Sequence, residues 1–203
     1  MMLSSSVLLM MSWVDSIIIG IFKPDAEIGI YNVAIRLAMI SSIILGSVNS
    51  IVAPKLSFAY NNNIKKAFAK IVKESTRLIF FSTLPILLLL VLFPTLLLSI
   101  FGEEFINGRN TLLILLIGQA VNAMSGSVGV IMQMTGKEKQ FRNILFFALL
   151  INISLNLFLI PVHGILGAAI ASTISIIFWN ITSVLYIYRK LHVLTFINFI
   201  KKP

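Results

Sequence analysis

The 203-residue chain is 58% hydrophobic and only 11% charged, which excludes an ordinary water-soluble domain. Its net charge of +9 does not indicate nucleic-acid binding, because the basic residues lie between apolar runs and do not alternate with aromatic residues. The absence of cysteine excludes disulfides and thiolate metal sites. We therefore predict an all-α integral membrane protein.

Six apolar runs are each about as long as a membrane-spanning helix. The first, 3–22, contains Asp15, and the second, 28–53, contains Arg36. We expect the second run to end at Pro54, because proline interrupts the hydrogen bonds of a helix. The other four predicted spans are 78–101, 111–134, 144–160 and 165–187.

A basic amphipathic segment lies between the second and third runs. Over residues 56–77, apolar side chains recur at helical spacing, and lysine or arginine occupies many of the other positions. This pattern predicts an interfacial helix on an anionic membrane surface. Pro85 and Pro94 are expected to kink the span that follows. We predict one six-helix lobe over residues 1–190 and a cytoplasmic tail over 191–203.

The last two runs are uncharged and are separated by Pro161-Val162-His163-Gly164, which predicts an antiparallel hairpin of two membrane helices. Small residues then recur at four-residue spacing on two tracks, Gly164, Ala168, Ser172 and Gly167, Ala171, Ser175. Such faces let helix backbones approach closely in lipid, and generic helix packing is their simplest interpretation.

The distribution of basic residues predicts an orientation. Lys23 and Arg109 lie on one side of the predicted bundle, Arg36 lies within a span, and every other lysine and arginine lies on the opposite side. Because cytoplasmic loops are enriched in basic residues, we expect that opposite side and both termini to be cytoplasmic.

Two ionisable residues within spans are the main candidates for a functional site. Asp15 and Arg36 would lie at similar depth in an antiparallel pair, roughly 10–12 Å below the outer boundary. They can form a buried ion pair that fixes the hairpin. Alternatively, Arg36 contacts a phosphate or another anion and Asp15 serves as a modulator or a cation or proton site, because intramembrane charges usually face a cavity or a partner.

Uncharged polar residues within the spans are weaker candidates. Asn49, Gln119 and Asn122 are candidates for the wall of a substrate or ion cavity, and Asn152 and Asn156 are secondary candidates that share one helix face. Hydrogen bonding between helices is the commoner function of such side chains in membranes. The sequence shows no nucleophile–base pair, phosphate loop or metal-ligand cluster, so we predict neither an enzyme nor a metal site.

The order of several motifs resembles the second half of polysaccharide flippases, the O-antigen and exopolysaccharide flippases that share a superfamily with the multidrug and toxin extruders. No single motif is specific, but their order covers almost the whole chain. The motifs are Trp13-Val14-Asp15, residues 27–37, Val52-Ala53-Pro54 before the basic helix, residues 134–139, residues 152–157 leading to Leu159-Ile160-Pro161, and residues 164–172.

The resemblance implies a MATE-like transporter of two lobes, each with six helices, around a cavity that opens to each side in turn. Such proteins move undecaprenyl-pyrophosphate-linked sugar units across the bacterial inner membrane. Cationic cavity residues are thought to meet the pyrophosphate, which makes Arg36 and Asp15 the best candidates here. No cofactor is implied, although coupling to an H⁺ or Na⁺ gradient is expected. The chain would need an N-terminal six-helix lobe, on the same or a separate chain.

Several other functions stay open at this point. A drug/cation antiporter or a lipid II flippase of the same superfamily is the nearest alternative, and a non-transporting truncated remnant or assembly partner is another. A membrane enzyme such as a glycosyltransferase is least favoured, because only Glu103-Glu104 approximates the clustered carboxylates it would need.

Overall fold

The computed structural model describes residues 2–197, without the side chains of 2–6, 8, 9 and 12, and all regular structure in this part is helical. The elements are α1 (Met2–Phe22), α2 (Asp25–Asn61), α3 (Lys65–Leu92), α4 (Pro94–Ser99), the 3₁₀ helix η1 (Glu103–Gly108), α5 (Arg109–Ser125), α6 (Val128–Met134), α7 (Glu138–His163) and α8 (Ile165–Leu191).

Four of the described helices, α2, α3, α7 and α8, are long and apolar enough to cross a membrane. The bent pair formed by residues 103–125 and 128–134 would make a fifth span, and α1 contributes the shorter apolar segment Trp13–Phe22. These helices bear out the prediction of an all-helical, multi-pass membrane protein. They do not reproduce the six separate spans with the predicted bounds.

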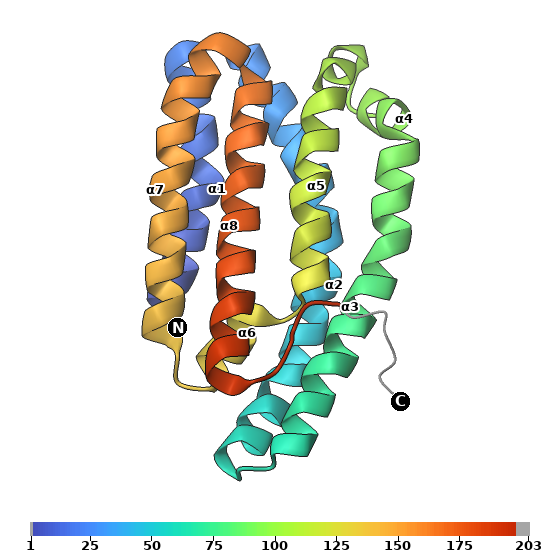
Figure 1. Ribbon diagram of the computed structural model, residues 1–203. Helices are drawn as coiled ribbons and strands as arrows, with labels where there is room; N and C mark the ends of the chain where they lie inside the picture. The colour runs from blue at the N-terminus through green and yellow to red at the C-terminus, as the bar shows by residue number, and fades with distance from the viewer. Residues whose placement is uncertain (1, 198–203) are drawn as a thin grey trace.

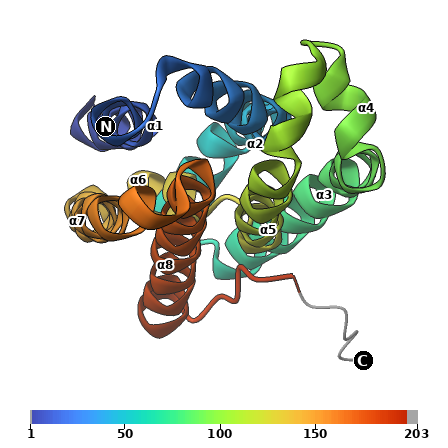
Figure 2. The ribbon, with the colours of Figure 1, turned by 90° about the horizontal axis from the view of Figure 1, so that it is seen from above.

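The helices run roughly parallel to one long axis, with their connections gathered at the two ends (Figure 1). The α1–α2 and α7–α8 turns lie at the same end as α4, whereas the α2–α3 turn and α6 lie at the opposite end. Helix α8 packs against both α7 and α5, and α2 packs against both α3 and α5. The view along the axis shows α1 beside α2 and α7, which is the arrangement that positions Asp15 (Figure 2).

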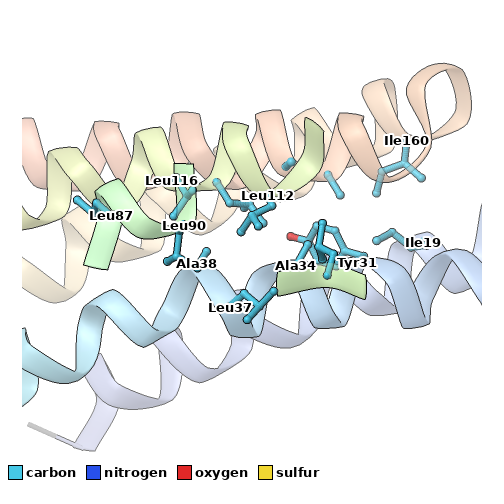
Figure 3. Packing of buried hydrophobic residues seen from close by; sticks show 14 of the residues in the cluster. Ile19, Tyr31, Ala34, Leu37, Ala38, Leu87, Leu90, Leu112, Leu116 and Ile160 are labelled. Carbon is cyan, nitrogen blue, oxygen red and sulfur yellow. The ribbon is translucent and has the colours of Figure 1, made fainter. Parts of the chain in front are cut away.

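Two hydrophobic clusters form the interior. The first joins Ile19, Tyr31, Leu112 and Ile160 near the α1–α2 turn, and Figure 3 shows the ring of Tyr31 packed among these side chains. The second brings residues such as Leu56 of α2 together with α3, α6, α7 and α8. Close packing of these side chains against one another holds the ends of the lobe together, because lipid tails are as apolar as the side chains themselves and leave van der Waals contact as the main attraction between helices.

The α7–α8 hairpin forms as predicted, but the turn is tighter. Helix α7 continues through Pro161 to His163, and only Gly164 interrupts it, with φ +56° in the left-handed region that favours glycine. Both small-residue tracks are buried, as the packing interpretation requires. The backbones of α7 and α8 lie so close at Gly167 that a Cβ atom there would be 2.5 Å from the carbonyl carbon of Leu159.

The predicted end of a span at Pro54 and the separate interfacial helix over 56–77 are both wrong. Helix α2 runs through Pro54 to Asn61, and α3 begins at Lys65, so a turn interrupts the predicted helix. The reason is packing: Leu56 of α2 and Phe68 of α3 are buried in the second cluster, which extends both helices beyond their apolar windows. Pro54 is exposed, and transmembrane helices tolerate proline.

The third and fourth predicted spans are each interrupted. Helix α3 passes through Pro85 and ends at Leu92, and Pro94 then occupies the first turn of α4, where its missing N–H costs nothing. The fourth span bends by 43° after Ser125. Gly126 has φ +70° at this bend, and a Cβ there would collide with the side chain of Thr76. The sequence offered no proline to mark this break.

Candidate functional site

Asp15 of α1 is fully buried and forms no ion pair with a cationic side chain among the described residues. Its Oδ2 atom accepts hydrogen bonds from the hydroxyls of Tyr31, at 2.6 Å, and Ser172. Its Oδ1 atom accepts from the side-chain amides of Asn152, at 3.1 Å, and Asn156, at 2.6 Å. We call these five residues the Asp15 cluster. Two donors on each oxygen match the acceptor capacity of an ionised carboxylate.

The cluster joins four helices, α1, α2, α7 and α8. Asn152 and Asn156 are four residues apart on α7 and therefore share one face. They also contact each other at 3.2 Å, and Asn152 donates to Ser172 at 3.3 Å. The predicted hydrogen bonding between helices is thus found at both asparagines.

The cluster contains one acceptor without a partner. Among the described residues, the buried Oδ1 atom of Asn156 accepts no hydrogen bond, although an unpaired buried polar atom costs about 1–3 kcal/mol. The side chains that donate to Asp15 are hydroxyls and amides, so no described cation would offset the negative charge of its ionised form. Rotating the amides would present several oxygens, the ligands that hard cations prefer. This donor set fits a proton or a small monovalent cation.

Arg36 lies elsewhere, so the predicted ion pair with Asp15 does not form. Its side chain is exposed, and it has no hydrogen bond or ion pair with a described residue. Helix α2 begins at Asp25, earlier than predicted, so Tyr31 reaches the level of Asp15. Arg36 is five residues further on, roughly 7–8 Å deeper and about 140° around the helix. The error was therefore in the assumed start of the helix.

The face of α2 that carries Arg36 is otherwise mostly apolar. Ile40 and Ile43 are exposed on it, and the exposed hydroxyl of Ser47 donates back to the Ile43 carbonyl oxygen at 3.0 Å. Arg36 is roughly 16 Å from the start of this apolar helix. Within a membrane a guanidinium is costly against lipid, and such charges usually face water or a polar partner.

The remaining predicted cavity residues do not join the Asp15 cluster. Gln119 of α5 is buried, and its Oε1 atom accepts a hydrogen bond of 2.9 Å from Ser42 of α2. Asn49 and Asn122 are half-buried, and their Oδ1 atoms have no partner among the described residues.

Tyr31 and Ser172 are the members of the cluster that sequence reasoning did not identify as site residues. Tyr31 lies within the first two turns of α2, at a distance from the turn that matches Asp15 on α1. Ser172 belongs to a small-residue track that was interpreted only as a packing face. Matching depth across the hairpin could have indicated Tyr31.

The chain is similar to membrane transport proteins of several organisms. A family model described as MatE matches residues 1–158. The chain is 32% identical over 171 residues to a putative O-antigen transporter of Shigella flexneri, covering 82% of this chain and 40% of that protein. It is 26% identical over 165 residues to the probable low-salt glycan biosynthesis flippase Agl15 of Haloferax volcanii, covering 81% of this chain and 35% of that protein.

A third relative is the capsular polysaccharide biosynthesis protein CapF of Staphylococcus aureus, 30% identical over 169 residues, with 81% of this chain and 41% of that protein covered. The chain thus spans about two fifths, or less, of the length of these relatives.

Solved structures share the fold. A MOP superfamily transporter from Pyrococcus furiosus superposes with a TM-score of 0.79 at 16% identity, covering 98% of this chain and 45% of that one. An outward-facing multidrug resistance MATE family transporter gives the same TM-score, identity and coverage. At this identity the likeness establishes the fold alone, and both structures are more than twice as long as the matched region.

Proposed function

Because the chain belongs to the MatE family, we propose that it forms one lobe of a MOP superfamily transporter that moves a lipid-linked oligosaccharide across a membrane. The relatives named as an O-antigen transporter and a glycan biosynthesis flippase support this substrate class. An undecaprenyl-pyrophosphate carrier in a bacterial inner membrane, with both chain termini cytoplasmic, is the specific form of the proposal. A second lobe, on the same or another chain, would complete the cavity.

The observation that carries the proposal is the position of Arg36. It is an exposed charge on an apolar helix and has no partner within the described residues. Its planar guanidinium can form two parallel hydrogen bonds with phosphate oxygens, which suits a pyrophosphate-linked carrier. We assign Arg36 to the wall of the central cavity, where it contacts the anionic part of the substrate.

The Asp15 cluster supplies the coupling step of this proposal. Protonation of the carboxyl would turn one acceptor into a donor, so the four donors around it could not all keep their bonds. Binding of a monovalent cation would require the two asparagine amides to turn their oxygens inward. Either event biases the packing of α1 and α2 against α7 and α8, and an ion gradient can thereby shift the conformational equilibrium.

A drug/cation antiporter is the second candidate, because the Asp15 cluster on its own supports ion coupling without a phosphate-bearing substrate. The two functions differ in what they require of Arg36. A flippase needs its positive charge, whereas an antiporter for cationic drugs would be hindered by that charge or indifferent to it. A non-transporting remnant would need neither Arg36 nor Asp15.

The experiment is complementation of a strain that lacks its O-antigen flippase, with the chain expressed together with its second lobe. We expect Arg36→Gln to reduce surface polysaccharide at least tenfold, since a lost charge-assisted hydrogen bond costs about 1.5–3 kcal/mol. Arg36→Lys should retain part of the activity. Arg109→Gln, which changes the exposed arginine at the start of α5, is the matched control. Full activity of Arg36→Gln would refute the assigned substrate contact.

Ion coupling is tested separately with Asp15→Asn, a change of nearly equal shape. We expect transport to lose its dependence on the H⁺ or Na⁺ gradient while the protein still reaches the membrane. A variant that keeps the wild-type dependence on both ions would show that the cluster is purely structural.

A further inference from the structure

A cleft lies at the end of the lobe where α2 meets α3 and α8 ends, opposite the α1–α2 turn (Figure 1). A cavity of about 550 Å³ opens between the α2–α3 turn and the end of α8. A second cavity of about 260 Å³ lies between α3 and residues 192–197. Ala69, His192 and Val193 line both cavities, so we treat them as one feature and call it the basic cleft.

The described lining of the basic cleft is strongly cationic. No acidic residue occurs in it. It contains four lysines and one arginine, and also His192; the lysines and the arginine are Lys65, Lys66, Lys73, Arg77 and Lys190. The nearby carboxylate of Glu74 pairs with Lys70 at 3.8 Å, and neither residue lines the cleft. The cluster of like charges is therefore uncompensated within the described chain, which indicates an anionic ligand.

Two further features favour an anion. Helix α3 begins at the cleft without a side-chain cap or an acidic residue in its first turn, where Lys65 and Lys66 add to the positive end of the helix dipole. In the smaller cavity, Thr76 and Thr195 are almost fully buried, and their hydroxyls have no partner among the described residues. Lysine, arginine and hydroxyl donors together suit the oxygens of a phosphate.

The location and the apolar walls of the cleft indicate a lipid. The apolar part of α3 begins at Leu78, directly after Arg77, and α8 ends its apolar run just before Arg189 and Lys190. The cleft therefore lies at the membrane boundary. Phe68 and Leu191 provide apolar surface beside the cationic groups, which suits the first carbons of an acyl chain.

We infer that the basic cleft binds an anionic phospholipid, with its phosphate near Lys73 and Arg77 and its glycerol and upper acyl carbons against the apolar wall. Basic pockets between membrane helices on the cytoplasmic side bind such headgroups in other systems. The inference goes beyond the proposed transport cycle, since Arg36 lies on a different part of α2 and does not line the cleft.

The test uses the intact protein purified from membranes and native mass spectrometry with phosphatidylglycerol or phosphatidylcholine added. The wild type should bind phosphatidylglycerol in preference to phosphatidylcholine. Each basic residue near an anionic headgroup contributes about fivefold, so Lys73→Gln combined with Arg77→Gln should weaken phosphatidylglycerol binding about 25-fold. Ala69→Phe, which fills the cleft without changing a charge, should weaken it as well.

The matched control removes one lysine and one arginine that lie outside the cleft, Lys139→Gln with Arg189→Gln. Equal loss in this control would mean that bulk charge, not the cleft, attracts the lipid, and would overturn the inference. Wild-type binding by the Lys73 and Arg77 double variant would overturn it too. Displacement of the lipid by inorganic phosphate at comparable concentration would show a site for a soluble anion instead of a lipid.

Discussion

Replacing Tyr31 with phenylalanine removes one hydroxyl from the Asp15 cluster and leaves the aromatic ring in the first hydrophobic cluster. The lost hydrogen bond is 2.6 Å long, and both partners are fully buried, so water cannot replace the hydroxyl. A hydrogen bond to a charged group contributes about 1.5–3 kcal/mol to the free energy of unfolding. We therefore expect Tyr31→Phe to destabilise the lobe by about that amount.

The assay is thermal unfolding of the purified protein in detergent, followed by tryptophan fluorescence. For a chain of this size each kcal/mol shifts the apparent Tm by about 2–4 °C, so the expected decrease is about 3–12 °C. Tyr188→Phe, at an exposed tyrosine near the end of α8, should leave the Tm unchanged. A Tyr31→Phe variant that unfolds at the wild-type temperature would contradict the hydrogen-bond network around Asp15.

A double-mutant cycle with Asp15→Asn separates the charge from the packing. In the Asp15→Asn background the Tyr31 hydroxyl meets a neutral group, and neutral hydrogen bonds contribute only about 0.5–1.5 kcal/mol. The cost of Tyr31→Phe should therefore fall to about half or less, which gives a measurable coupling energy. Equal costs in both backgrounds would mean that Asp15 is not ionised in the state that the structure represents.

Close contacts between helices lead to three further predictions. Gly167→Ala should destabilise the lobe by more than about 2 kcal/mol, because the added Cβ would lie 2.5 Å from the Leu159 backbone. Its control is Gly46→Ala, where the added Cβ would have no atom within 4 Å. That variant should stabilise the lobe by up to about 1 kcal/mol in the same unfolding assay. Gly126→Ala should also lower the Tm, and Thr76→Ala should recover part of the loss, since Thr76 is the obstacle. Gln119→Leu should cost about 0.5–1.5 kcal/mol through its bond to Ser42, and no measurable change would contradict that contact.

The sequence predicted the helical hairpins well and their ends less well. The α7–α8 pair was predicted from two uncharged runs and the hinge Pro161-Val162-His163-Gly164 between them, because both signals are local in the chain. Only Gly164 of that hinge interrupts the helices. The continuation of α2 past Pro54 depends on the burial of Leu56 against α3, a contact between segments that no local pattern encodes. The bend at Gly126 likewise depends on the position of Thr76 on another helix.

The candidate site was predicted only in part, again because the sequence shows local patterns but not contacts between distant segments. Asp15 was identified because a carboxylate in an apolar run is unusual, and the shared face of Asn152 and Asn156 follows from their spacing. The predicted pairing of Asp15 with Arg36 was wrong. Helix α2 begins three residues earlier than predicted, and Tyr31, not Arg36, lies at the level of Asp15. The predicted depth of a residue in a pair of helices is therefore only as accurate as the predicted ends of those helices.

The proposed substrate contact depends most directly on Arg36 facing water within the membrane, and cysteine accessibility measures this. The chain has no cysteine, so Arg36→Cys introduces a single thiol in this lobe. In cells that make the complete transporter, a membrane-impermeant thiol reagent should label the Arg36→Cys variant but should not label Phe81→Cys, an exposed apolar position on α3. Labelling of the Arg36 variant that is slowed by added lipid-linked oligosaccharide would place the residue in the substrate cavity. If the Arg36 variant is as unreactive as the Phe81 variant, the face of α2 that carries Arg36 does not line a water-filled cavity, and the proposed substrate contact is wrong.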